Sequence, residues 1–254
     1  MKKKTVSIML AATMALSLFA GCGSSKDTAT EDTSKTESTE TTDESSENAS
    51  AETTDESSRT TFTVGFDAEY PPYGYMDDDG EYTGFDLELA QAVCDKEGWE
   101  LVKKPINWDS KDMELNSGSI DCIWNGFTMN GREDEYTFSV PYVDNSQVIV
   151  VAENSGIEQL SDLAGKTVGV QAASAALDLL QSEDEGGQKA LADTFGSLNE
   201  FADYNTAFTE LQAGALDALA IDVGVAKYQL NSRGEGFKIL DETLNTEQYA
   251  IGFK

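Results

Sequence analysis

The 254-residue sequence contains no histidine and few basic residues, with 17 Lys and Arg against 47 Asp and Glu and a formal net charge of −30. The lack of histidine excludes nucleophilic catalysis of the Ser-His-Asp and Cys-His types and metal sites with histidine ligands. The acidity argues against nucleic acid as a partner, since Lys and Arg neutralise phosphates, and against a polybasic surface for anionic lipid. The cysteines show no CxxC spacing, so we expect no metal cluster, and we expect no cofactor.

A long hydrophobic run occurs only near the N-terminus, from Val6 to Ala20 after three lysines. This pattern predicts a signal peptide over residues 1–21, and the run is too short for a membrane-spanning helix. The segment Leu18-Phe19-Ala20-Gly21-Cys22 resembles a bacterial lipobox. That resemblance implies that Cys22 is lipidated and anchors the protein to the membrane. The alternative is an ordinary secretory signal with a chance cysteine.

Residues 22–60 contain no aromatic residue and no Val, Ile or Leu, and they hold 11 acids against 3 bases. Such a segment cannot bury enough apolar surface to fold, and its like charges keep it extended. We expect a disordered acidic tether rich in Ser and Thr, with an interaction tail as the alternative. From Thr61 onward the chain holds 36 acids and 11 bases, so the folded part is itself acidic.

After the tether, hydrophobic patterns of strands and helices alternate in two successive series. In the first series we expect strands at 62–66, 99–102, 120–124 and 147–152 and helices at 110–116 and from Asp86, a candidate N-cap. In the second we expect strands at 167–170, 198–201, 216–221, 237–240 and 249–253 and helices at 157–163, 173–181, 206–212 and 223–230. The pattern predicts an α/β protein with two lobes and mostly parallel sheets. Lobe 1 is expected at 61–147, completed by about 246–254, and lobe 2 at 148–245, with the ligand cleft between them.

An ordered set of short motifs resembles the polar amino acid-binding proteins of bacterial ABC importers, from about Thr63 to Lys254. The motifs are Asp67-Ala68-Glu69-Tyr70-Pro71-Pro72-Tyr73, Gly84-Phe85-Asp86-Leu87-Glu88-Leu89-Ala90, Asn125-Gly126-Phe127-Thr128 followed by Arg132, Phe138-Ser139-Val140-Pro141-Tyr142, Leu163-Ala164-Gly165-Lys166-Thr167-Val168-Gly169-Val170, and Gly214-Ala215-Leu216-Asp217-Ala218 leading to Asp222. The resemblance implies the two-lobed periplasmic-binding-protein fold (type II). It also implies a receptor that captures a free amino acid and delivers it to an ABC permease.

The resemblance assigns the two ends of the amino acid to two charged residues. Arg132 corresponds to the Arg that binds the carboxylate, and a guanidinium fork suits a carboxylate. Asp222 corresponds to the Asp that pairs with the α-ammonium group, with Thr128 and the carbonyl of Gly126 as further acceptors. The alternatives are a surface Arg in an acidic loop and a helix N-cap role for Asp222. The chain departs from the family in having one residue fewer between Thr128 and Arg132, and Gly131 permits the tighter turn.

Other positions complete the implied pocket. Ala173, Ser174 and Ala175 replace a Gly-Thr-Thr-like loop that faces the carboxylate at a helix N-terminus; Ser174 as a plain N-cap is compatible with this. Tyr70 and Trp108 correspond to residues that sandwich the ligand's side chain, whereas Tyr73 and Trp124 are either pocket walls or core residues. The positions that reach the ligand's side chain hold Asp67, Glu69 and Gln171, which suggests a polar or cationic amino acid.

The remaining expectations follow from these. The protein is expected to be a monomeric, lipid-anchored receptor on the outer face of the cell membrane, and not an enzyme. The alternatives are an enzyme of the same fold, such as a dehydratase with Glu69 as its acid, and an amino acid-sensing domain. Cys94 and Cys122 are either two buried thiols or a disulfide. Family members continue past Lys254 with a terminal helix or two, so a truncated reading of a longer chain is a further alternative.

Overall fold

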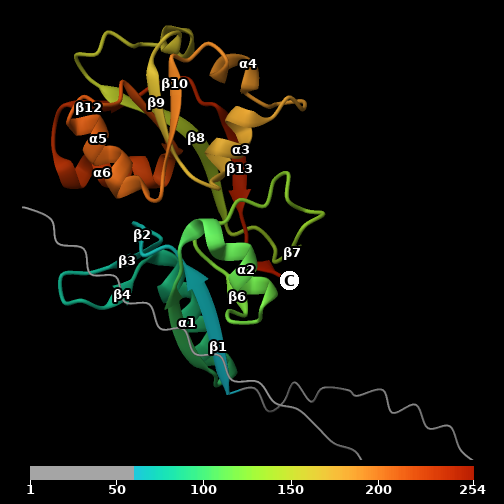
Figure 1. Cartoon of the computed structure of the whole chain (residues 1–254). Coiled ribbons are helices and arrows are strands. Elements are labelled where there is room, and N and C mark those ends of the chain that lie inside the picture. Colours follow the sequence, from blue (N-terminus) through green and yellow to red (C-terminus); the bar gives the residue numbers. More distant parts are fainter. Residues whose placement is uncertain (1–59) are drawn as a thin grey trace, which may run out of the picture. The chain divides into compact units, whose positions relative to one another are not determined.

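The computed structural model describes residues 60–254, and the expected signal peptide, Cys22 and all but the last residue of the tether lie outside them. Two larger sheets organise these residues (Figure 1). The first sheet has the strand order β5 (Glu100–Pro105), β1 (Thr61–Phe66), β6 (Cys122–Ile123), β14 (Gly252–Phe253) and β7 (Thr137–Phe138). The second has the order β10 (Ser197–Phe201), β9 (Thr167–Gln171), β11 (Ala218–Asp222), β8 (Val143–Ala152) and β12 (Phe237–Ile239), and β13 (Asn245–Tyr249) also pairs with β8.

Each sheet combines a parallel centre with antiparallel additions. In the first sheet β1 is parallel to β5 and β6, whereas β14 runs antiparallel to β6 and β7. In the second sheet β9 is parallel to β10 and β11, whereas β8 runs antiparallel to β11, β12 and β13. The prediction of two series of mainly parallel strands is therefore correct for the sheet centres. The chain passes between the sheets from β7 to β8 and from β13 to β14, and all four of these strands take part in antiparallel pairs.

We call the first sheet with its helices the first lobe. Its helices are α1 (Phe85–Glu97) and α2 (Lys111–Asn116), the latter preceded by a 3₁₀ turn at Trp108–Ser110. Both faces of the sheet are covered, because alternate residues along a strand point to opposite faces. Cys122 of β6 packs in the core on the α1 side, and the next residue, Ile123, packs in the core on the α2 side. A small sheet of β2 (Glu69–Tyr70), β3 (Gly74–Met76) and β4 (Tyr82–Thr83) lies between β1 and α1 in the sequence.

The second sheet with its helices forms the second lobe, which contains α3 (Ala175–Gln181), α4 (Lys189–Ala192), α5 (Tyr204–Gln212) and α6 (Val223–Arg233). Val148 and Val150 of β8 pack with α5 and α6, whereas Ile149 and Val151 pack with α3. Figure 1 shows α5 and α6 on one side of the strands and α3 on the other. The continuous apolar run in β8 is thus explained by burial on both faces.

Several predicted elements differ from the observed ones. Asp86 is not an N-cap: Gly84 holds that position, and Asp86 lies inside α1 with its side chain buried. The expected helix at 157–163 is only a 3₁₀ turn at Leu160–Leu163, where the side chain of Asp162 accepts the backbone N–H groups of Glu158 and Gln159. The expected strand at 249–253 is divided between β13, which pairs in the second sheet, and β14, which pairs in the first.

Two further features concern the whole of the described chain. No helix among residues 60–254 has the length and apolar character needed to cross a bilayer. Cys94 and Cys122 are both buried in the first lobe and are not joined by a disulfide.

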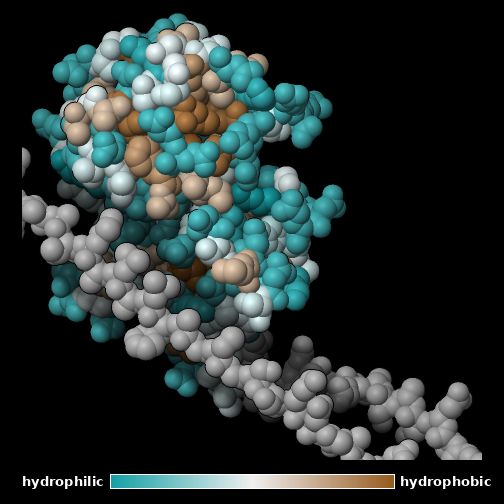
Figure 2. Space-filling view, viewed as in Figure 1, coloured by the Kyte–Doolittle hydropathy of each residue, from teal (hydrophilic) through white to brown (hydrophobic). Residues whose placement is uncertain are grey.

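On the face drawn in Figure 2, hydrophilic residues surround smaller hydrophobic areas, as the acidic sequence leads one to expect.

Candidate ligand-binding site

A small cavity lies where the carboxyl ends of the parallel strands of both sheets meet. Its walls come from segments that directly follow β1, β5, β6, β9 and β11, or from the last residues of these strands. This is where ligands bind in open α/β sheets. The lining residues are Tyr70, Trp108, Asn125, Gly126, Thr128, Arg132, Gln171, Ser174, Ala175 and Asp222. Eight of the ten residues expected at the site thus line one cavity, and the other two, Asp67 and Ala173, contact its rim.

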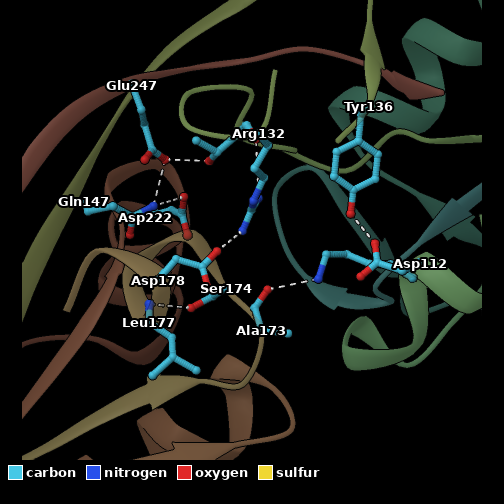
Figure 3. Close-up of polar contacts among 12 residues, drawn as sticks. Asp112, Arg132, Tyr136, Gln147, Ala173, Ser174, Leu177, Asp178, Asp222 and Glu247 are labelled. Atoms are coloured by element: carbon cyan, nitrogen blue, oxygen red, sulfur yellow. Dashed lines mark hydrogen bonds and ion pairs between the residues drawn. The ribbon is translucent and has the colours of Figure 1, made fainter. Parts of the chain in front are cut away.

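Arg132 lies in the loop after β6, and its side chain is 11% exposed. Its guanidinium group is 5.1 Å from the ring centre of Phe127, which holds the fork by a cation–π contact. Nη2 donates to Oδ2 of Asp178 in α3 at 2.6 Å, and Nη1 lies 3.4 Å from the carbonyl of Thr128 (Figure 3). Arg132 is therefore no loose surface residue. It is directed into the cavity and paired with a carboxylate of the other lobe.

Asp222 ends β11 and precedes α6, but its side chain makes no capping bond to that helix. Instead Oδ1 accepts hydrogen bonds from Asn145 at 2.8 Å, Gln147 at 2.7 Å and the hydroxyl of Tyr249 at 2.6 Å. Asp222 is 4% exposed. Burial, followed by the charge of Glu247, raises the pKa of Asp222 to about 6. Asp222 thus occupies the N-cap position of α6, as the alternative expected, but its side chain serves the buried network and does not cap the helix.

Gly126 and Thr128 each donate a hydrogen bond to a buried carboxylate, of Asp86 and Glu247 respectively. The N–H of Gly126 donates to Oδ2 of Asp86 at 2.6 Å, and Asp86 is so deeply buried that its pKa is raised to about 7. Gly126 has a φ of +57°, and a Cβ there would lie 2.9 Å from Tyr70. The hydroxyl of Thr128 donates to Oε1 of Glu247 at 2.8 Å, which leaves its lone pairs free to accept from a ligand.

The loop before α3 contributes a helix N-terminus to the cavity wall. Ser174 is the N-cap of α3, and its hydroxyl oxygen accepts a hydrogen bond from the N–H of Leu177 at 3.2 Å (Figure 3). Ser174 also lines the cavity. Ala173 has a φ of +54°, a left-handed conformation that costs an alanine about 1–2 kcal/mol. Its carbonyl accepts from Nζ of Lys111 in the first lobe at 3.2 Å. The alanine thus takes a backbone conformation that glycine adopts most readily.

The aromatic candidates divide into two groups. Tyr70 and Trp108 line the cavity, each less than 9% exposed. Tyr73 packs with Tyr70 and Tyr249 in the core between α5, α6 and the small sheet, and Trp124 packs in the core of the first lobe. For Tyr73 and Trp124 the structure therefore supports the alternative of core packing.

Asp67 and Glu69 lie in a wider neighbouring cavity of about 600 Å³. It shares Trp108 with the small cavity and has five acidic residues in its lining: Asp67, Glu69, Asp109, Glu114 and Asp203. Asp67 accepts a 2.6 Å hydrogen bond from the amide of Gln171, and burial raises its pKa to about 6. Negative charge therefore surrounds the space into which a ligand's side chain would extend.

The lobes are in contact around the small cavity, whose volume is about 10 Å³, the space of about one water molecule. The contacts across it are those of Arg132 with Asp178, Lys111 with Ala173, Gln171 with Asp67, and Asn205 with Glu69. An amino acid therefore needs the lobes to separate before it can enter. Such opening is the usual hinge motion of two-lobed binding proteins.

Sequence reasoning missed several residues of the site. Asn125 lines the cavity and belongs to the motif that also contains Gly126 and Thr128, but it was given no role. Asp178, Lys111 and Glu247 contact Arg132, Ala173 and Thr128 respectively. No local pattern marks these three, because each meets its partner only through the folding of distant segments. Among the described residues, no group of three or more Cys, Asp or Glu is arranged to hold a metal ion.

Comparison with known proteins agrees with this geometry. The family model described as bacterial extracellular solute-binding proteins, family 3, matches residues 62–229. The chain is 29% identical to the L-cystine-binding protein TcyJ of Escherichia coli (strain K12), over 77% of this chain and 71% of that protein. It is 32% identical to the arginine-binding extracellular protein ArtP of Bacillus subtilis (strain 168), over 75% of this chain and 73% of that protein. An ABC uptake transporter substrate-binding protein from Streptococcus pneumoniae with bound histidine superposes with a TM-score of 0.72 and 35% identity, covering 76% of this chain and 79% of that one.

Proposed function

Because the chain belongs to the bacterial extracellular solute-binding proteins of family 3, we propose that it captures a free amino acid outside the cytoplasm and delivers it to an ABC permease. The observation that carries the proposal is the placement of Arg132 and Asp222 on the same small cavity, one from each lobe. A free amino acid has one carboxylate and one ammonium group, so these two residues match both charges without leaving either unpaired. Relatives that bind cystine, arginine and histidine support the same class of ligand.

The lining residues suggest how the ligand is held. The carboxylate meets the Arg132 fork and the N-terminus of α3 at Ser174, and the ammonium meets Asp222, Thr128 and the carbonyl of Gly126. Tyr70 and Trp108 lie against the ligand's side chain. That side chain is polar or cationic, because the adjoining 600 Å³ cavity carries five carboxylates.

A thermal-shift screen tests this proposal. The protein is heated with each of the twenty amino acids and with cystine, ornithine and citrulline, since a ligand that binds only the folded state raises the midpoint. We expect a rise for one or a few polar or cationic amino acids. The absence of a rise for every compound would refute the proposal.

We further propose that the protein binds its ligand without turnover and that it acts as a monomer with two lobes, at 61–147 with 246–254 and at 148–245. These boundaries fall inside β8 and β13, the two strands of the second sheet that connect the lobes. An enzyme would need a poised acid, and Glu69 instead accepts a hydrogen bond from Asn205 at the edge of the wider cavity. Incubation with the bound amino acid, followed by mass spectrometry, should recover it unchanged at one equivalent per chain. Any product would contradict this part of the proposal.

The lipid anchor at Cys22 is a proposal that rests on the lipobox-like sequence alone. It predicts that cells expressing the protein incorporate a labelled fatty acid into it and hold it at the outer face of the membrane. The Cys22→Ala variant should lose the label and appear in the medium. Label that persists in this variant would show that the anchor lies elsewhere.

A further inference from the structure

A second buried carboxylate, Glu247, stands beside Asp222. Both belong to the second sheet, where β8 lies between β13 and β11. Glu247 pairs with Asn145 across one side of β8, and Asp222 pairs with Gln147 across the other. Asn145 and Gln147 are two residues apart on one strand and so point to the same face. The strand register therefore brings two acids and two amides together.

The two carboxylates share the same two hydrogen-bond donors, Asn145 and Gln147, of which Figure 3 shows Gln147. The amide nitrogen of Asn145 lies 2.8 Å from both Oδ1 of Asp222 and Oε1 of Glu247. The amide nitrogen of Gln147 lies 2.7 Å from the first oxygen and 2.8 Å from the second. The amide oxygens of Asn145 and Gln147 are buried and have no partner among the described residues. Both available amide donors are thus committed to the two acids.

No positive side chain balances this pair. None of the salt bridges in the described part of the chain involves Asp222 or Glu247. The groups that face Asp222 from neighbouring elements are Tyr70, Tyr73, Tyr204 and Tyr249, and burial raises the pKa of each, so they remain neutral. The nearest guanidinium on the cavity, that of Arg132, is paired with Asp178. Two buried and adjacent carboxylates cannot both stay ionised at low cost without a cation.

We propose that Glu247 is a positioning residue for the ligand's ammonium group, and that in mildly acidic solution Asp222, with Glu247 beside it, holds a proton that the ammonium replaces. Glu247 acts in two ways: it orients the Thr128 hydroxyl as an acceptor, and it adds a second negative charge behind Asp222. This inference rests on the proposed function, since it needs an amino acid in the cavity. It predicts that binding releases a proton, because the ammonium favours the fully ionised pair.

The expected size follows from the Asp222 pKa of about 6. Below that pH the ligand must displace the proton, and above it Asp222 is already ionised. The affinity should therefore rise about tenfold between pH 5 and pH 7. Binding should release most of one proton at pH 5.5 and almost none at pH 7.5.

Isothermal titration calorimetry in buffers of different ionisation enthalpy measures the released protons directly. The probes are L-arginine, L-glutamine and L-cystine, none of which titrates between pH 5 and pH 7. We compare the wild-type protein with Glu247→Gln, which keeps the shape of the side chain and removes its charge. In this variant the proton release at pH 5.5 should be clearly smaller than in the wild type, and the affinity should rise less than tenfold between pH 5 and pH 7, because the charge of Glu247 is removed while the burial of Asp222 remains.

Two further variants separate the alternatives. Glu200→Gln makes the same charge change at an exposed site on β10 and should behave as wild type. Asp67→Asn removes another buried acid near the cavity, and proton release should persist in this variant. If the wild-type protein binds a probe without releasing a proton, the inference is overturned. It is also overturned if proton release is lost in Asp67→Asn but kept in Glu247→Gln. Neither result would affect the proposed function. If none of the three probes binds, the amino acid that raises the midpoint in the thermal-shift screen takes their place; if no amino acid does so, both the inference and the proposed function are overturned.

Discussion

The ion pair between Arg132 and Asp178 makes a prediction about affinity that can be worked out from the geometry. A ligand carboxylate that binds in bidentate fashion needs two N–H donors of the Arg132 guanidinium. One of these nitrogens, Nη2, already donates to Asp178 at 2.6 Å. Asp178 must therefore give up its bond when the ligand binds, which means that it competes with the ligand for Arg132. Replacing it with asparagine should strengthen binding.

The expected gain is modest because Asp178 is 60% exposed. Ion pairs of this kind contribute about 0.2–1 kcal/mol, so Asp178→Asn should improve the affinity by about 1.5- to 5-fold. Arg132 should keep its place in the variant, since its contact with the Phe127 ring at 5.1 Å does not involve Asp178. Salt screens exposed charges, so the gain should shrink at high ionic strength.

Titration calorimetry with L-arginine, L-glutamine and L-cystine at pH 7, in 20 mM and 500 mM salt, provides the measurement. Asp193→Asn is the matched control: Asp193 is 62% exposed and pairs with Lys189 on α4, away from the cavity. Weaker binding by Asp178→Asn would refute the reasoning, because Asp178 would then support the bound state. An equal gain in the control would show that only the overall charge matters.

The other predictions concern Arg132, Gly126 and the buried acids. Arg132→Ala should lower the affinity for every α-carboxylate at least 100-fold, since two charge-assisted hydrogen bonds are lost; calorimetry showing retained binding would contradict the assignment. Gly126→Ala should lower the free energy of unfolding by about 1–3 kcal/mol in urea denaturation, because its φ is +57° and its Cβ would meet Tyr70 at 2.9 Å and Tyr249 at 3.0 Å; an unchanged midpoint would contradict this. Without ligand, the melting temperature should fall as pH rises from 5 to 7.5. Burial raises the pKa of Asp67, Asp86 and Asp222 in the folded protein. The folded state therefore binds more protons than the unfolded state in this range, and stability is lost as these protons dissociate. The Asp86→Asn variant should show a smaller fall, and equal falls would argue against this role for Asp86.

The parts of the fold that the sequence predicts well are those with simple hydrophobic patterns. The alternation in β1 and the apolar run in β8 from Gln147 to Ala152 both correspond to observed strands. The missed parts are polar strands: β8 begins four residues earlier, at Val143, and β13 has the sequence NTEQY. These strands are polar because they carry Asn145 and Glu247, whose side chains are buried in the network around Asp222. The local pattern fails where strand residues serve the site and not the core.

The candidate site shows the same division. Arg132, Asp222 and Thr128 could be named because each stands in a motif with a fixed place in the chain, and all three line the cavity. Asp178 and Lys111 could not, since they sit in unremarkable helical sequence and reach the site only when the two lobes approach each other. Their roles depend on tertiary distances that periodicity and motif spacing do not encode.

The contacts at the two ends of the cavity suggest why the ligand can be exchanged. At the carboxylate end, Arg132 is neutralised by Asp178, which is exposed enough to return to water at little cost. At the ammonium end, Asp222 is buried and cannot move away, so in our proposal a proton takes the part that Asp178 plays at the other end. Below about pH 6, each charge of the zwitterion then replaces a weaker partner, and neither Arg132 nor Asp222 is left as an unpaired charge before the ligand binds. The affinity for the amino acid is therefore set by the difference between the two sets of partners, which the variants of Asp178 and Glu247 measure separately.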